Sequence, residues 1–227
     1  MTEATFGAFG KIPSVGDFFR INPPPGFASV WDEWLQRCLV SGAHGYGSRW
    51  DELYMSVPIW RFCLSPGVAG ASGVIGVLMP SVDRVGRRFP LTLVGPLPDS
   101  MPVIEAHLSS DDTFEMLETI ALSVLDDDLS KDILAERLEG VGFSAVHAVT
   151  ACSVVPGSSV VCRAKTSQQM VRTTTAELLA RSFASPTIWS TLMEEDSRLM
   201  VCDGLPDGLN MQGLFDLDAD LWREGIL

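Results

Sequence analysis

Three apolar segments close together in the first half of the chain constrain its fold more than any other feature. They span residues 58–65, 73–79 and 88–95, and Pro96 and Pro98 follow the last of them. Short apolar runs bounded by turn residues are typical of strands that are covered on both faces. The sequence therefore predicts a sheet with helices packed on each side.

Other segments have the spacing of amphipathic helices or of strands. In residues 27–41 the side chains of Trp31 and Trp34 share one face, which predicts core positions rather than a ligand site, and Ser41 with Gly42 is expected to end this helix. Further helices are expected at 112–125, 129–139, 175–184 (with Thr174 and Glu177 as a capping box) and 208–217, and strands at 145–149, 160–162, 187–193 and 199–202. We predict one α/β domain over residues 1–227, a mixed β-sheet with helices on both faces in a three-layer αβα sandwich.

The charge of the chain is strongly acidic and unevenly distributed. Asp and Glu number 29 against 16 Lys and Arg, for a net charge of −13, and the acidic excess lies wholly in the helix-rich residues 101–227, since residues 1–100 are balanced. Such a surface repels nucleic acid, so we expect no nucleic-acid partner. No segment has the apolar length of a membrane span, the first residues do not resemble a signal peptide, and the five cysteines are widely spaced. These features predict a cytoplasmic protein with free thiols and no membrane insertion.

Residues with the spacing of a catalytic or metal site are not found. The three histidines, His44, His107 and His147, form no metal-ligand motif, and the glycine-rich residues 7–12 place Ile12 where a phosphate loop needs Ser or Thr. No G-x-S-x-G elbow occurs either, although a triad can be assembled from residues far apart in sequence. The sequence predicts no catalytic residue, cofactor or metal.

A basic segment between the second and third apolar runs stands out in this acidic chain. Residues 80–90 (PSVDRVGRRFP) hold Arg84, Arg87 and Arg88 beside Asp83. One interpretation is a recognition loop that binds a carboxylate, a phosphate or a partner backbone through bidentate hydrogen bonds. The other is a structural loop whose Asp83 pairs with these arginines or with turn carbonyls. Residues 16–20 (GDFFR) present the same choice, and their adjacent aromatics cannot both be buried in a straight strand covered on one face.

Four motifs in order along the chain resemble the TagF family, also called ImpM, accessory proteins of bacterial type VI secretion systems. They are residues 10–19 (GKIPSVGDFF), 31–36 (WDEWLQ), 58–62 (PIWRF) and 76–92 (GVLMPSVDRVGRRFPLT). Residues 187–191 (TIWST) and 203–206 (DGLP) fit the family's later part more loosely. The family's basic motif corresponds to Ser81, Asp83, Arg84, Gly86, Arg87 and Phe89, whereas Arg88 departs from it.

This resemblance implies a non-enzymatic cytoplasmic regulator. Members of the family repress assembly or firing of the secretion apparatus after translation, by engaging a scaffold protein that carries a forkhead-associated domain. We predict a partner-binding surface formed by Asp17, Arg20, Ser81, Asp83, Arg84 and Arg87. Replacing Arg84 and Arg87 together by Ala is expected to weaken scaffold binding and leave thermal unfolding almost unchanged.

Two other functions stay open from the sequence. The chain can be a structural or assembly subunit of the apparatus, or an enzyme that acts on a phosphorylated substrate with Asp83 among its arginines. The sequence does not determine the oligomeric state.

Overall fold

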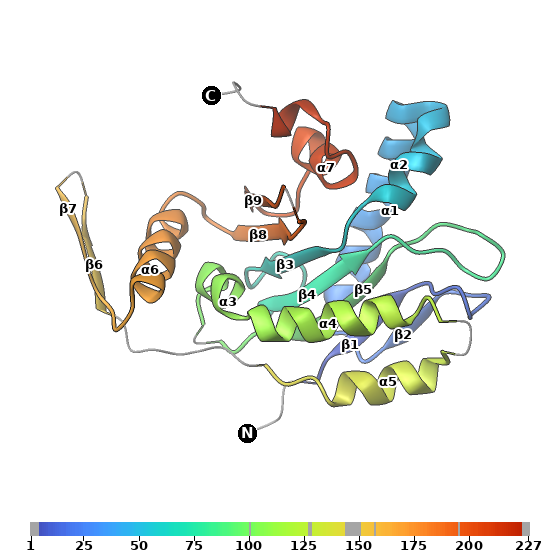
Figure 1. The fold of residues 1–227 in the computed structure, drawn as a ribbon, viewed down its shortest axis with the longest axis horizontal. Helices are drawn as coiled ribbons and strands as arrows, with labels where there is room; N and C mark the ends of the chain where they lie inside the picture. The colour runs from blue at the N-terminus through green and yellow to red at the C-terminus, as the bar shows by residue number, and fades with distance from the viewer. Residues whose placement is uncertain are drawn as a thin grey trace.

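The three apolar segments form the middle of a seven-stranded sheet (Figure 1). The structure, a computed structural model, describes residues 5–99, 101–126, 129–143, 151–156, 158–194 and 196–223. The sheet has the order β2-β1-β5-β4-β3-β8-β9. Its strands are β1 (Gly7–Gly10), β2 (Phe19–Ile21), β3 (Trp60–Leu64), β4 (Val74–Met79), β5 (Leu91–Pro96), β8 (Pro186–Thr191) and β9 (Arg198–Asp203).

Every neighbouring pair of strands in this sheet is antiparallel, whereas we expected a mixture of directions. Loops alone connect β3 to β4 and β4 to β5, and a connection without a crossover helix returns the chain in the opposite direction. Strands β8 and β9, from the acidic part of the chain, extend the sheet by pairing β8 with β3.

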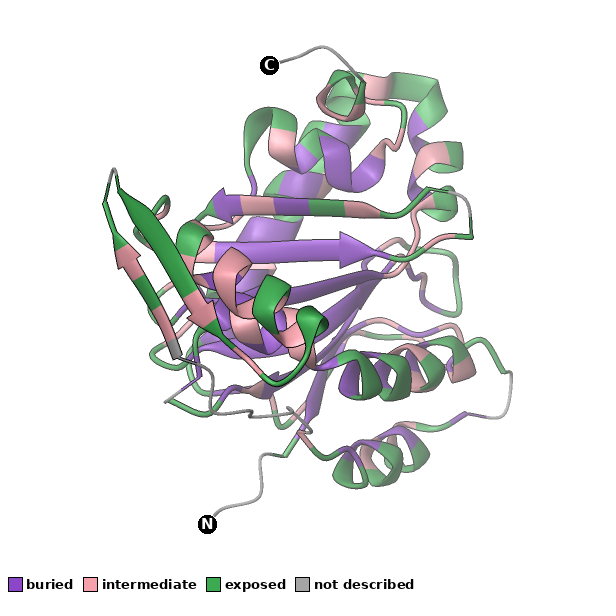
Figure 2. Ribbon diagram, turned by 60° about the vertical axis from the view of Figure 1, so that its left-hand side comes forward, coloured by how far each residue is buried: buried purple, intermediate pink, exposed green. Residues whose placement is uncertain are grey.

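Helices cover both faces of the sheet, which confirms the predicted α/β class (Figures 1 and 2). One layer contains α1 (Phe27–Tyr46), α2 (Trp50–Ser56) and α7 (Gly208–Phe215), with short 3₁₀ turns at Gly47–Arg49 and Asp220–Trp222. The other layer contains α3 (Val103–Ser109), α4 (Asp111–Ser123) and α5 (Lys131–Glu139). Because both faces of the central strands are covered, their residues are buried almost without interruption, as Figure 2 shows in purple.

An aromatic core joins α1 to the last part of the chain. The rings of Trp31 and Trp189 are stacked at 6.0 Å with an interplanar angle of 2°, and the Trp34 indole donates to the Pro206 carbonyl at 2.9 Å. Both α1 tryptophans are at most 2% exposed, which confirms their predicted core role. The two later motifs that resemble the TagF family thus pack directly against the early one.

A small two-stranded sheet lies outside the main one and packs against a helix. Strand β6 (Ala151–Val155) pairs with β7 (Ser159–Arg163), and both contact α6 (Ser167–Ala180), which in turn contacts α3. The strand predicted at 160–162 is confirmed within β7, and the one predicted at 145–149 falls outside the described residues.

Four helices differ from the prediction, two in their bounds and two because they were not predicted. Helix α6 begins eight residues before the predicted 175, because Thr166, not Thr174, caps it through a 3.2 Å bond to the backbone N–H of Gln169. Helix α1 continues through Gly42, whose missing side chain makes room for the Trp50 ring. Helices α2 and α3 were not predicted, since seven residues carry too little periodic signal.

Candidate functional site

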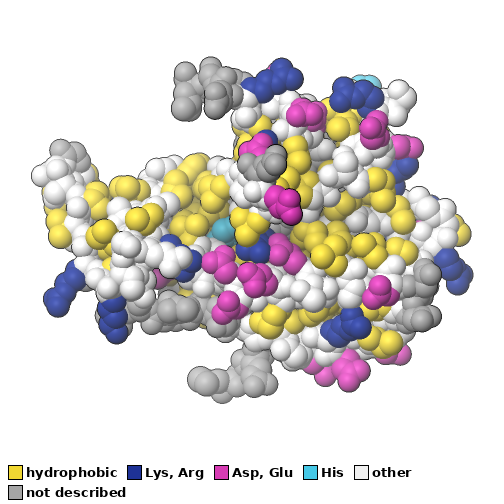
Figure 3. All heavy atoms as spheres, in the orientation of Figure 1, with side chains coloured by type: hydrophobic (Ala, Val, Ile, Leu, Met, Phe, Trp, Pro, Cys, Tyr) yellow, Lys and Arg dark blue, Asp and Glu magenta, His cyan; other side chains and the backbone are white. Residues whose placement is uncertain are grey.

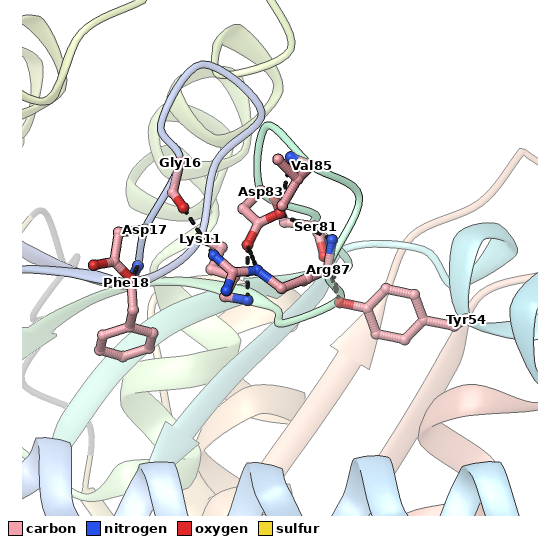
Figure 4. Close-up of polar contacts among 9 residues, drawn as sticks. All are labelled: Lys11, Gly16, Asp17, Phe18, Tyr54, Ser81, Asp83, Val85 and Arg87. Atoms are coloured by element: carbon pink, nitrogen blue, oxygen red, sulfur yellow. Dashed lines mark hydrogen bonds and ion pairs between the residues drawn. The ribbon is translucent and has the colours of Figure 1, made fainter.

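The two predicted recognition segments, far apart in sequence, meet at one end of the sheet. We call residues 11–18, between β1 and β2, and residues 80–90, between β4 and β5, the loop pair (Figure 4). The backbone N–H of Arg84 donates to the Val15 carbonyl at 3.2 Å, and the Arg87 guanidinium donates to the Gly16 carbonyl at 2.8 Å. Antiparallel pairing of β1 with β5 brings the two loops together.

A tight turn at the tip of residues 80–90 is organised by Asp83. The Gly86 N–H donates to the Asp83 carbonyl at 2.8 Å, and Gly86 has φ +81°, a conformation that favours glycine. The Asp83 carboxylate accepts further bonds through Oδ1, from the N–H groups of Val85 at 3.0 Å and Arg87 at 2.9 Å. The aspartate side chain therefore fixes the backbone that carries Arg84 and Arg87.

The other oxygen of Asp83 binds two cations. Its Oδ2 lies 2.6 Å from Arg87 Nε and 3.0 Å from Lys11 Nζ, and Asp83 is only 2% exposed. Burial alone would raise the pKa of Asp83, but the hydrogen bonds from the Arg87 backbone, Lys11, the Arg87 side chain and the Val85 backbone together hold it well below its usual range. Asp83 is thus ionised at neutral pH, and four donors occupy the acceptor sites of its two oxygens.

Helix α2 fixes the base of the same loop. The Tyr54 hydroxyl donates to the Ser81 carbonyl at 2.8 Å and accepts from the Ser81 N–H at 3.1 Å, and all of these groups are buried (Figure 4). Further along the same loop, Arg88 forms a 2.7 Å ion pair with Asp51 of α2. Arg88, which departs from the TagF pattern, is therefore committed to a contact with α2.

Arg84 is the free cation of the loop pair. Its side chain is exposed beside Gly16 and forms no hydrogen bond or ion pair with the residues that the structure describes. The adjoining Val85 is 69% exposed. Arg84 and Val85 thus project from a turn that the Asp83 carboxylate holds in place.

The remaining predicted residues lie along the same surface. Asp17 is exposed and its Oδ1 accepts from the Phe18 N–H at 2.8 Å. Arg20, also exposed, lies over the rings of Phe9 and Phe18 at 5.4 and 5.7 Å. Phe18 and Phe19 point to opposite faces of the sheet. Each packs against the hydrophobic core on its own side, because helices lie on both faces.

The structure therefore brings the six predicted residues together but gives them different roles. Asp17, Arg20, Arg84 and Arg87 are exposed, whereas Ser81 and Asp83 are buried and position the loop. Sequence analysis missed Lys11 and Tyr54 as parts of this site. The position of Lys11 within the 10–19 motif could have indicated its role. No sequence pattern indicated that Tyr54, in the short helix α2, contacts Ser81.

Within the described residues, no cluster of three or more His, Cys, Asp or Glu side chains could hold a metal ion. All five cysteines are free thiols, as predicted. None of the helices in the described ranges combines the length and apolarity needed to cross a bilayer.

Comparison with known proteins identifies the family. A family model described as "TagF N-terminal domain, Type VI secretion system-associated" matches residues 7–141, more than half of the chain and all of the loop pair. The chain belongs to the TagF family. This confirms the resemblance seen in the motifs and associates the chain with type VI secretion.

A solved structure of similar fold extends the match beyond the residues of the family model. The crystal structure of PA0076 from Pseudomonas aeruginosa PAO1 aligns with a TM-score of 0.76 and 26% sequence identity, covering 95% of this chain and 96% of that one. No curated protein matches this TagF-family chain. The sandwich with its second set of strands, β8 and β9, is thus consistent with the fold of PA0076.

Proposed function

We propose that this chain is a non-enzymatic accessory protein of the type VI secretion system that represses assembly or firing of the apparatus after translation. In this proposal it acts in the cytoplasm by binding a scaffold with a forkhead-associated domain. Family membership supports the link to the secretion system. The repression and the scaffold partner are what resemblance to the family implies.

Our assignment of the loop pair as the binding surface rests on the exposed guanidinium of Arg84. The turn around it is fixed by Asp83, Lys11 and Tyr54, so little conformational freedom is lost when a partner docks. Arginine is enriched among residues that dominate interface energies, because its planar group forms bidentate hydrogen bonds. A rigid turn that presents one unpaired guanidinium beside exposed Val85 suits a protein partner.

The bonding of Asp83 argues against the enzymatic alternative at this site. A general base needs an oxygen free to take a proton from the substrate. Both oxygens of Asp83 accept bonds from within the chain, and its lowered pKa makes it a weak base. Binding chemistry is therefore favoured over phosphoryl or acyl transfer at the loop pair.

Calorimetry with the purified scaffold tests the surface. Replacing Arg84 by Ala should weaken binding at least tenfold, a loss of about 1.4 kcal/mol. Arg181→Ala is the matched control, because Arg181 is an exposed arginine at the end of α6, outside the loop pair. Equal affinity of wild type and Arg84→Ala would reject the loop pair as the binding surface.

Deletion in the native bacterium tests the direction of the effect. A repressor predicts increased secretion when the gene is removed, whereas a structural or assembly subunit predicts loss of secretion. Reintroducing Arg84→Ala should reproduce the deletion phenotype without reducing the amount of folded protein. Restoration of normal secretion by that variant would contradict the proposal.

A further inference from the structure

A cavity of about 350 Å³ lies away from the loop pair, where six elements of the fold converge. Strands β3, β8 and β9 and helices α3, α4 and α6 contribute its walls, and the end of the molecule that carries β6 and β7 is nearby in Figure 1. In Figure 3, a histidine and basic side chains lie beside acidic ones in the middle of this face. The volume falls in the range of small-molecule sites.

Three guanidinium groups line this cavity against one carboxylate. Arg61, Arg172 and Arg198 come from three different elements, and Asp111 is the one acidic residue of the lining. Asp111 is shared, lying 3.5 Å from Arg61 and 3.1 Å from Arg172. Each guanidinium is paired with a carboxylate, since Glu118 just outside the lining binds Arg61 through two 2.7 Å bonds and Asp196 pairs with Arg198. Arg172 and Arg198 each have five N–H donors and keep some of them free of these pairs.

Two buried polar atoms of the same lining have no partner. His107 is 4% exposed and its Nε2 lies 2.8 Å from Ser190 Oγ, but its Nδ1 meets no hydrogen-bonding group among the described residues. The Nε of Arg198 is likewise buried without a partner there, while its terminal nitrogen pairs with Asp196. Buried groups of this kind are rare and call for an explanation, since nearly all find a partner in native proteins.

The protonation of His107 determines what these atoms can bind. Burial, aided by the nearby positive charge of Arg61, lowers the pKa of His107 to about 3, so the ring is neutral at pH 7. The Ser190 hydroxyl can donate to Nε2 or accept from it, and when it donates, the neutral ring carries its proton on Nδ1. In that tautomer both unpartnered atoms, His107 Nδ1 and Arg198 Nε, are donors that a ligand oxygen would satisfy.

The rest of the lining is apolar. Phe114 and Leu108 form part of the wall, and Leu192 and Leu199 lie at its surface with 60% and 50% exposure. A ligand that fits must therefore combine oxygen acceptors for the free N–H groups with an apolar body. A phosphate dianion fits less well than a carboxylate, because it places two negative charges near Asp111, Glu118 and Asp196.

We propose that this cavity binds a carboxylate carried on a short branched apolar group. The carboxylate is held by Arg172 and Arg198 and accepts from His107, and the apolar group packs against Phe114 and Leu199. This chemistry occurs both in a free branched-chain acid and in the C-terminal leucine of a peptide. The proposal is independent of scaffold binding at the loop pair.

Titration of the full chain with matched probes tests the ligand class. The probes are 4-methylpentanoate, an N-acetylated peptide that ends in leucine, and the corresponding amides of both, with 4-methylpentyl phosphate as the competing anion. At least one acid should bind at least tenfold more tightly than its amide and than the phosphate. Tighter binding of 4-methylpentanoate identifies a free acid, and tighter binding of the peptide identifies a C-terminus. Equal binding of acid and amide, tighter binding of the phosphate, or no binding of either acid at millimolar concentration would overturn the proposal.

Substitutions in the wall locate the binding. Arg172→Gln and Arg198→Gln should each weaken binding of the acid at least tenfold. Arg181→Gln, directly after α6 and outside the cavity, should leave binding unchanged. Because Arg198 also stacks on Trp222, a second measurement uses the wild-type protein. The ring ¹⁵N resonances of His107 should shift when the acid is added and stay in place with the amide. Unchanged resonances at saturation would place the ligand elsewhere and reject the site.

Discussion

Lys11 Nζ lies 3.0 Å from the buried Oδ2 of Asp83, and this ion pair ties the loop after β1 to the loop between β4 and β5. The same oxygen accepts from Arg87 Nε at 2.6 Å, so one carboxylate holds two cations of the loop pair in place. The surface that we assign to partner binding depends on this buried aspartate, which itself is almost inaccessible to a partner.

Replacing Asp83 by Asn should lower the melting temperature and weaken scaffold binding together. The amide keeps the shape of the side chain but leaves Lys11 and Arg87 without their counter-charge. For the melting temperature alone, Asp17→Asn is the control, because Asp17 is exposed and an amide oxygen can still accept from the Phe18 N–H. Thermal unfolding measured by circular dichroism should separate the two variants, and identical melting would show that the Asp83 ion pairs contribute nothing to stability.

The two arginines of the turn should differ in their effect on stability. Arg84→Ala should change the free energy of unfolding by less than about 0.5 kcal/mol, since Arg84 has no polar partner in the described structure. Arg87→Ala should cost up to about 1 kcal/mol, because it removes an ion pair whose arginine is largely exposed. Urea titration of both single variants measures these losses. The single variants are more informative than the double substitution, because the double variant combines the two changes in unfolding free energy. A larger loss for Arg84→Ala would contradict the assignment of a free side chain.

Tyr54→Phe should destabilise the protein by about 1–3 kcal/mol, because the buried N–H of Ser81 would lose its partner. The Ser81 carbonyl keeps its bond from the Phe89 N–H at 3.1 Å, which limits the loss. Phenylalanine preserves the ring volume, so the difference in urea unfolding reports on the hydroxyl alone. Full stability of this variant would show that α2 does not fasten the loop.

Acidification should destabilise the protein through His107 before carboxylates contribute. The pKa of His107 is about 3 in the folded state and about 6.5 when the chain is unfolded. Between these two pH values only the unfolded state binds a proton at His107, so the folded state loses stability as the pH falls. The free energy of unfolding should drop by about 1.4 kcal/mol per pH unit below about pH 6 from this group. Urea titrations from neutral pH to about pH 4 measure the slope. His107→Gln should reduce it, and His44→Gln, at an exposed position of α1, should not.

A chain that ends at residue 143, just beyond the family match, should not unfold cooperatively. Truncation removes β8, which pairs with β3, and Trp189, which stacks on Trp31 in the centre of the core. It also removes α7, so one face of the sheet loses cover. Tryptophan fluorescence in urea measures the transition, with the full chain as reference. A sharp transition of the truncated chain would show an independent domain and would contradict the predicted single domain over residues 1–227.

Local patterns determined the elements that are long or strongly apolar. The continuous apolar runs around Phe62, Val77 and Leu93 predicted three covered strands, and the spacing of Trp31 and Trp34 predicted the buried face of α1. These signals are reliable because burial of both faces of a strand leaves a continuous apolar run in the sequence, and burial of one helix face leaves apolar residues at helical spacing. Two sequence motifs also marked the surface on which the candidate residues are found.

Tertiary structure alone decided which partner each polar side chain meets. The sequence allowed Asp83 to pair with Arg84, Arg87 or Arg88, and the fold assigned it Arg87 and Lys11 while Arg88 turned to Asp51. It also decided the direction of the strands and brought Arg61, His107 and Arg198 to one cavity. Periodicity records burial along one segment, but a contact between segments depends on how the sheet places them, and no local pattern encodes that distance.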